Sequence, residues 1–150
     1  MSMENSQCSA AQILEALRSG DNDNARSAAF SAGDMGMEEA VPLLCERIKS
    51  ENIGVQEAAE YGLRKIRGPQ AIEALLPLLR SDEAPVRNVA MDILREIGVD
   101  SIESMQPYLR DDDPDLRIFI ADILGYCRSH QSALLLGDAL LKDPEVNVRY

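Results

Sequence analysis

The sequence predicts an all-α protein in which antiparallel helix pairs stack in a row, an α-solenoid expected to wind as a right-handed superhelix. Three observations lead to this prediction. The first is an amphipathic helical pattern that returns every 30 or 31 residues, and the second is another helical pattern that follows each copy of it. The third is that the 150 residues include no Trp, four Tyr and two Phe, which argues against a β-sandwich or barrel.

The first helix of each pair carries apolar residues at helical spacing. In the copy at 86–97 these residues are Val86, Ala90, Ile93, Leu94 and Ile97. Related stretches occur at 25–30, 55–66, 116–127 and, as a beginning, 143–150. Small residues stand at matched positions, Ala29, Ala59 and Ala90, and we expect them to let neighbouring helices approach closely.

The second helix of each pair has its own pattern, seen in Ile72, Leu75, Leu76 and Leu79. Its copies lie at 38–45, 71–80, 101–110 and 134–141, and a lone copy at 11–18 opens the chain. Three copies contain proline at one register, Pro42, Pro77 and Pro107. An interior proline removes a helical hydrogen bond, so the shared register predicts a kink that belongs to the repeat.

Turn and cap residues agree with these boundaries. Asp113-Pro114 and Asp143-Pro144 read as an N-cap followed by proline at the first helical position. Gly68-Pro69 marks the turn between paired helices. In the final repeat, the first helix of the pair is predicted to begin at Asp143. We expect this repeat to be truncated, and we expect the apolar surface left at its end to be covered by another chain or by more of a longer protein.

The pattern resembles the HEAT-like repeats of the phycobilisome-lyase type. That repeat reads acidic–Pro–x–Val–Arg, then Ala and Leu at helical spacing, then a glycine turn and an apolar second helix. Matching stretches run from Asp82 to Arg110 and from Asp113 to Lys142. The resemblance implies about four and a half repeats in a single domain over 9–150, preceded by a flexible segment at 1–8.

The resemblance also implies that second helices line a concave surface. Successive residues of a helix are 100° apart, so we can predict which residues of the second helices point away from the apolar face. These residues form two rows. These rows are Glu38, Glu73 and Glu103, and beside them Leu43, Leu78, Tyr108 and Asp138. We expect an acidic stripe beside an apolar one, suited to a basic amphipathic peptide or helix. The alternative is that these are ordinary solvated positions of an acidic protein.

Two arginines share a register near the start of first helices, Arg87 and Arg117. Acidic residues stand close to them in sequence, namely Asp82, Asp112 and Asp113. We expect a structural role, in which each guanidinium bonds to carboxylates or carbonyls and joins adjacent repeats.

The composition argues against several functions. The net charge is −11, which opposes nucleic-acid binding. The sequence has no signal peptide and no apolar run long enough for a membrane span, so we expect a cytoplasmic protein. Three cysteines show no metal-ligand spacing, and His130, the single histidine, has no partner for catalysis or metal binding. We therefore expect no cofactor and no catalytic site.

The function that follows is a non-enzymatic scaffold that binds a protein or peptide on its concave face. One alternative is a phycobilin-lyase-like subunit or chaperone, which the resemblance suggests; another is a regulatory fragment of a longer protein. We also expect end-to-end self-association through the uncapped C-terminal repeat.

Overall fold

The computed structural model describes the backbone of residues 2–148 and the side chains of residues 10–148. All regular structure within this part is helical, which confirms the all-α prediction. The chain forms two compact units, Met1–Ala74 and Leu75–Tyr150.

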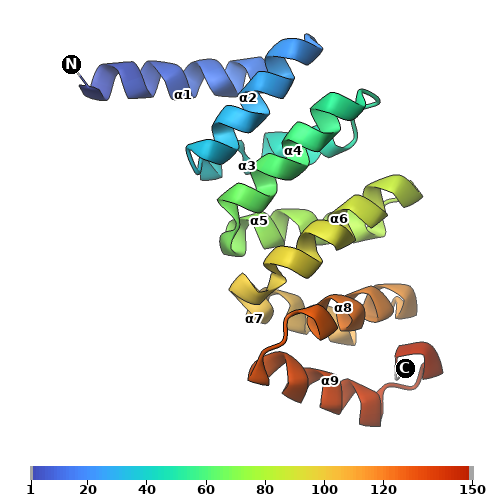
Figure 1. The fold of residues 1–150 in the computed structure, drawn as a ribbon. Coiled ribbons are helices and arrows are strands. Elements are labelled where there is room, and N and C mark those ends of the chain that lie inside the picture. Colours follow the sequence, from blue (N-terminus) through green and yellow to red (C-terminus); the bar gives the residue numbers. More distant parts are fainter. Residues whose placement is uncertain (1, 149–150) are drawn as a thin grey trace. The chain divides into compact units, whose positions relative to one another are not determined.

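The first unit contains two first helices that pack side by side. Its elements are α1 (Ser2–Arg18), α2 (Asn22–Asp34), the 3₁₀ helix η1 (Glu38–Ala40), α3 (Val41–Ile48), α4 (Ile53–Ile66) and most of α5 (Gly68–Leu75). Helix α2 packs against α1 and α4, and α3 packs against α4 (Figure 1). The alternating first and second helices predicted from the sequence are therefore present here.

The second unit repeats this arrangement. Its elements are η2 (Leu76–Arg80), α6 (Ala84–Ile97), η3 (Gly98–Ser101), α7 (Ile102–Met105), η4 (Gln106–Arg110), α8 (Pro114–Tyr126), α9 (His130–Lys142) and η5 (Val146–Val148). Helix α8 packs against α6, η4, α9 and η5. Here too a first helix, α8, lies against the helix pair before it, α6 and η4.

Short polar side chains start several helices, among them Asp113 as predicted. Asp143, which was also predicted as an N-cap, is instead the C-cap of α9, and within the described residues only the 3₁₀ turn η5 follows it. Asp21 accepts a hydrogen bond from the N–H of Asn24 at 2.8 Å, and Asp113 accepts one from Asp115 at 2.9 Å. At α9, Ser129 and Ser132 form a reciprocal capping box. These bonds satisfy backbone N–H groups that have no partner inside the helix.

The prolines divide the second helices, as their shared register predicts. Pro77 lies in η2, directly after α5, and Pro107 lies in η4, directly after α7. Proline has no N–H to donate, so the α-helical ladder cannot continue unbroken and the chain tightens into 3₁₀ turns. Pro42 differs, because it stands at the beginning of α3 after η1.

Apolar spacing correctly identifies the core. The five apolar residues of α6 are each at most 3% exposed, as are the four of the second helix at 71–80. Backbones approach closely where α2 meets α4. A Cβ built on Gly33 would lie 2.8 Å from the Cα of Gly62, and one on Gly62 would lie 3.0 Å from the Ala29 carbonyl oxygen. Glycine is required at this contact because no larger side chain fits between the helices.

Candidate functional site

The predicted partner-binding residues lie on second helices in both units. In the first unit Glu38 and Glu73 are exposed, and Leu43 is half-buried. The second unit holds the other four: Glu103 and Asp138 are exposed, and Leu78 and Tyr108 are half-buried. Because each row includes residues of both units, its alignment along the chain stays a prediction.

Glutamine side chains connect successive second helices, a feature that the sequence analysis missed. The Gln70 Nε2 donates to the backbone oxygen of Glu38 at 3.2 Å. In the second unit, the Gln131 Nε2 donates to the Glu103 Oε1 at 3.1 Å. The pKa of Glu103 is lowered, first by a hydrogen bond from its own backbone N–H and then by Gln131. Its carboxylate is therefore charged and oriented at neutral pH.

A polar hollow of about 450 Å³ opens between η4 and α9, two second-helix segments of the second unit. Its walls include Arg110, Asp111, Asp138 and Lys142. Asp138 pairs with Lys142 at 2.5 Å on the surface of α9. The sequence analysis identified Asp138 but not the basic residues beside it, because their meeting depends on how η4 and α9 are placed.

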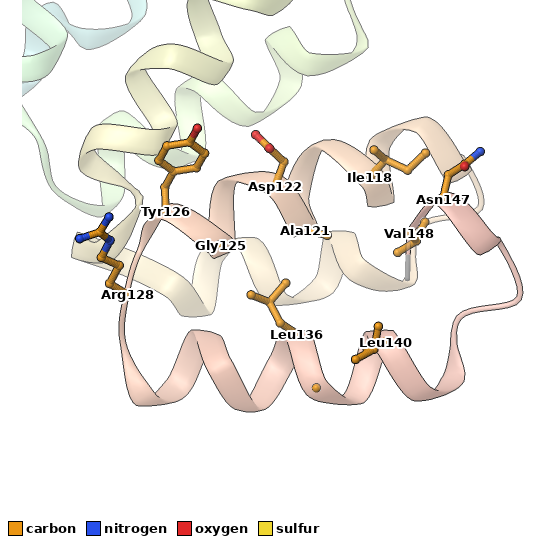
Figure 2. Close-up of a pocket in the computed structure, with 11 residues that line it drawn as sticks. Ile118, Ala121, Asp122, Gly125, Tyr126, Arg128, Leu136, Leu140, Asn147 and Val148 are labelled. Atoms are coloured by element: carbon orange, nitrogen blue, oxygen red, sulfur yellow. The ribbon is translucent and has the colours of Figure 1, made fainter. Parts of the chain in front are cut away.

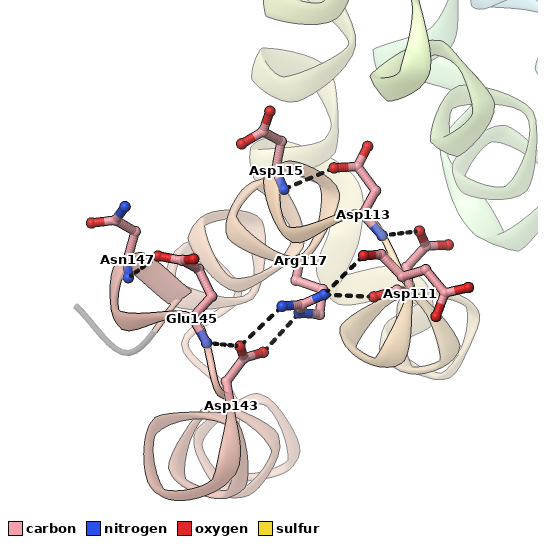
Figure 3. A network of polar contacts seen from close by, with 8 residues as sticks. Asp111, Asp113, Asp115, Arg117, Asp143, Glu145 and Asn147 are labelled. Carbon is pink, nitrogen blue, oxygen red and sulfur yellow. Dashed lines mark hydrogen bonds and ion pairs between the residues drawn. The ribbon is translucent and has the colours of Figure 1, made fainter.

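Arg117 is the centre of a polar network that joins α8 to the C-terminal end of α9. Its guanidinium bonds to both carboxylate oxygens of Asp143, at 2.9 and 3.2 Å. It also donates to the carbonyl of Asp111 at 2.8 Å and to that of Asp112 at 3.4 Å (Figure 3). The Arg117 and Asp143 side chains are 11% and 5% exposed. This arrangement is the bidentate geometry that arginine favours with carboxylates.

The other residues of the predicted network have different surroundings. Arg87 donates to the carbonyl of Ser81 at 2.7 Å, which is the register-equivalent of the bond from Arg117 to Asp111. Asp113 caps α8, and Asp82 is exposed. Both Arg87 and Arg117 thus donate to a backbone carbonyl in the turn before their own helix. Asp143, the carboxylate partner of Arg117, was not among the predicted residues.

A second hollow, of about 750 Å³, lies between α8 and α9, and we call it the α8–α9 groove. Figure 2 shows α8 on one side and α9 on the other, with Leu136 and Leu140 pointing inward from α9. Ile118 and Ala121 line the α8 wall, and Val148 of η5 lines one end. The sequence analysis expected an uncapped apolar end at the last repeat but did not predict this hollow, whose walls depend on how α8, α9 and η5 are placed.

Tyr126 stands at the other end of the groove and is 59% exposed. The Arg95 guanidinium lies 5.2 Å from its ring centre, within reach of a cation–π contact. Arg95 also pairs with Asp122, at 2.6 Å. Exposed tyrosine and arginine are the residues that most often contribute strongly to protein–protein binding.

The cysteine thiols in the described side chains are not arranged for chemistry. Burial raises the pKa of Cys45 to about 12 and also raises the pKa of Cys127, so both stay protonated at neutral pH. Cys8 lies outside the described side chains. His130 is exposed at the first turn of α9.

The described part of the chain gives no structural sign of a bound ion. Its side chains contain no group of three His, Cys, Asp or Glu placed to hold a metal. Each buried nitrogen or oxygen of the described side chains has a hydrogen-bond partner. Among the described helices, none combines the length and the apolar character needed to cross a membrane.

Comparisons with known proteins agree with the repeat pattern. A family model described as HEAT repeats matches residues 10–95. The Homo sapiens protein named Rho family-interacting cell polarization regulator 2 is 33% identical over 73 residues, which are 49% of this chain and 7% of that protein. The chain thus spans less than a tenth of this relative.

A solved structure shows the same type of fold. It is an engineered protein that superposes with a TM-score of 0.51 at 20% identity, covering 93% of this chain and 74% of the other. The complex of CpcE and CpcF of phycocyanin lyase from Nostoc sp. PCC7120 gives a TM-score of 0.46 at 18% identity, covering 95% and 94%. The family model spans more than half of the sequence, over the same repeats that form the helix pairs. The chain belongs to the HEAT-repeat family.

Proposed function

We propose that the chain is a non-enzymatic, cytoplasmic scaffold that binds a protein partner through its second helices. The polar hollow between η4 and α9 carries the proposal, because it gives the second unit a recessed surface with fixed charges of both signs. Membership of the HEAT-repeat family supports this role, since stacked helix pairs offer extended binding surfaces.

Asp138 in the hollow, and Glu103 and Tyr108 on second-helix segments outside its lining, combine features that suit recognition of a basic partner. Hydrogen bonds from its own backbone N–H and then from Gln131 lower the pKa of Glu103, and Asp138, paired with Lys142, presents a carboxylate from α9. Tyr108 is half-buried on η4 and adds an aromatic side chain. The relatives' name describes an interaction with Rho-family proteins, which supports a protein rather than a small molecule as the partner.

Paired charge reversals in each unit test the proposal. One variant carries Glu38→Lys and Glu73→Lys, and the other carries Glu103→Lys and Asp138→Lys. The matched controls change two exposed acids on first helices or just before them, Asp23 and Glu57 in one variant, and Asp82 and Glu83 in the other. The measurement is quantitative capture of partner proteins from the native cell, with each variant checked for its helical content.

The proposal expects at least one second-helix variant to lose most of the captured partner while its control keeps it. The unit affected then shows where the partner binds. Equal capture by all four variants would contradict the proposal, as would equal loss in a variant and its control, because that result reflects net charge alone.

A further inference from the structure

The polar hollow between η4 and α9 contains an arginine that is not used inside the chain. Within the described residues Arg110 makes no hydrogen bond or ion pair, and it is exposed. Apart from Asp112, the other charged residues of the walls are held in ion pairs: Asp111 with Arg80, Asp138 with Lys142, and Asp143 with Arg117. The hollow thus presents a guanidinium that can bind a group from outside.

The preceding step of the stack shows what an arginine at this position binds. Arg80 and Arg110 are the last residues of η2 and η4. The Arg80 guanidinium pairs with the carboxylate of Asp111, the C-cap of η4. The corresponding C-cap of α9 is Asp143, but Arg117 binds both of its carboxylate oxygens (Figure 3). Arg110 therefore has the position of a carboxylate-binding arginine whose expected acid is bound elsewhere.

A further helix pair after α9 would not be expected to cover Arg110. The walls of the hollow are η4, the turn before α8, Arg117, and α9 with the two residues that follow it. At the preceding step, the Arg80 side chain is 47% exposed although the next pair, α8 and α9, is in place. The same position in the next step should therefore remain accessible to a partner.

Two other features of the hollow suit a segment of a protein. Leu109 and Leu135, both half-buried, also line it, so the methylene groups of a bound side chain would have apolar neighbours. Asp112 is exposed, and its carboxylate has no partner within the described residues. A segment with a Lys or Arg near its acid would satisfy both Arg110 and Asp112. Its cation would also offset the repulsion from a chain with a net charge of −11.

We propose that Arg110 selects the protein partner by binding an aspartate or glutamate side chain of that partner in the polar hollow, as Arg80 binds Asp111. This inference rests on the proposed function, because it names the residue and the partner's group at that surface. A segment with basic residues alone would place a cation against Arg110 and bind less well. The partner segment therefore carries charges of both signs.

Selection from a phage-displayed library of random peptides tests the proposal before the partner is known. The full chain is the bait, and parallel selections use Arg110→Met and the control Arg128→Met. Arg128 is also exposed and has no ion pair among the described residues, but it lies outside the polar hollow. We expect the unchanged chain and Arg128→Met to enrich peptides with an acid near a base, and Arg110→Met to lose this enrichment.

An enriched peptide is then synthesised with its acidic residue and again with the matching amide. Fluorescence anisotropy measures the dissociation constant of both peptides for each protein, after circular dichroism has confirmed the helical content. The amide change should weaken binding at least about tenfold for the unchanged chain and less than about twofold for Arg110→Met. Arg110→Lys should bind the acidic peptide with intermediate affinity, because lysine keeps the charge but lacks the planar fork.

The two proposals fail in different ways. Enriched peptides that do not depend on Arg110, no enrichment at all, or an equal effect of the amide change with and without the guanidinium would overturn the role of Arg110. Binding that is lost in the variant with Glu103→Lys and Asp138→Lys but kept in Arg110→Met would also overturn it, while the second-helix surface of the proposed function would stand. Loss in both variants, together with the tenfold dependence on the peptide's acid, would support both proposals.

Discussion

Helices α4 and α9 belong to the same kind of repeat, yet they are held in opposite ways. Five residues of α4 are buried, including Ala58, Ala59 and Gly62 at its contact with α2. In α9 the buried residue is Ser132, which belongs to the capping box, and its leucines are half-buried or exposed. Close apolar packing holds α4, whereas polar bonds at the two ends of α9 hold that helix.

The comparison teaches where this protein can be open. The α2–α4 contact is sealed at glycine backbones, so nothing can enter it. The α8–α9 contact is joined through Arg117 and Asp143 at one end, and the space between the helices remains hollow. The α8–α9 contact is thus fixed at one end and open beside it, whereas the α2–α4 contact is closed.

Removing the Arg117 guanidinium should have the largest effect. Arg117→Met leaves the Asp143 carboxylate, 5% exposed, without its bidentate partner, and we expect a loss of about 2–3 kcal/mol in the free energy of unfolding. Urea denaturation followed by circular dichroism measures this loss. The control is Arg128→Met, which changes an exposed arginine and should leave the urea midpoint nearly unchanged. An equal shift in both variants would show that the network does not hold α9.

Adding one methyl group to the sealed contact should have the next largest effect. In Gly33→Ala the new Cβ would lie 2.8 Å from the Gly62 Cα, so α2 and α4 must separate. Overpacking of this kind costs about 2 kcal/mol. The same denaturation experiment measures it, and an unchanged midpoint would mean that the two helices are not in close contact.

The same methyl group in the open groove should act in the opposite direction. Gly137→Ala meets no atom within 4 Å and replaces glycine inside a helix, so we expect a gain of about 0.5–1 kcal/mol. Comparing the signs of the two glycine variants sharpens the contrast between α4 and α9. A destabilising Gly137→Ala would indicate that the groove is filled in solution.

The sequence was sufficient for the helix pairs because their information is local. Spacing such as that of Val86, Ala90 and Ile93 defines a buried face without knowledge of the neighbours. Pro77 and Pro107 divided the second helices as expected, for a reason internal to the helix. Whether the residues from 9 to 150 act as a single domain stays a prediction.

The candidate surfaces were predicted less well, because they depend on distances between elements. Exposure of Glu103 and Asp138 follows from helical period, but Gln131 as a partner of Glu103 requires the spacing of α7 and α9. The sequence predicted an uncapped apolar end at the last repeat but not the α8–α9 groove itself, since Leu136 and Leu140 have the spacing of core residues. That they line a hollow is a property of the assembled unit.

Acid should weaken the second unit through Asp111. Hydrogen bonding by the Asp113 N–H, and then by Arg80, holds the pKa of Asp111 below its ordinary value of 3.8. The unfolded chain therefore takes up this proton before the folded one does. The stabilisation is fully present above pH 3.8 and is lost as the pH falls through the lower, folded-state pKa.

Urea midpoints measured from about pH 6 down to about pH 2.5 should fall less steeply for Asp111→Asn than for the unchanged chain. The control is Asp112→Asn, since Asp112 is exposed and contributes its backbone carbonyl to Arg117. Parallel profiles for all three proteins would exclude Asp111 as a source of the acid sensitivity.

The cysteines should show the smallest response. With pKa values raised by burial, Cys45 and Cys127 should resist iodoacetamide at about pH 8 in the native protein and react fully in urea. Mass spectrometry of the alkylated peptides measures this. Rapid labelling of Cys127 alone would show that the second unit opens locally and often.

Hydrogen exchange compares α4 and α9 most directly. We expect amides of α4 (Ile53–Ile66) to exchange only through global unfolding, and those of α9 (His130–Lys142) to exchange far faster through local opening. Equal protection of α4 and α9 would contradict the account.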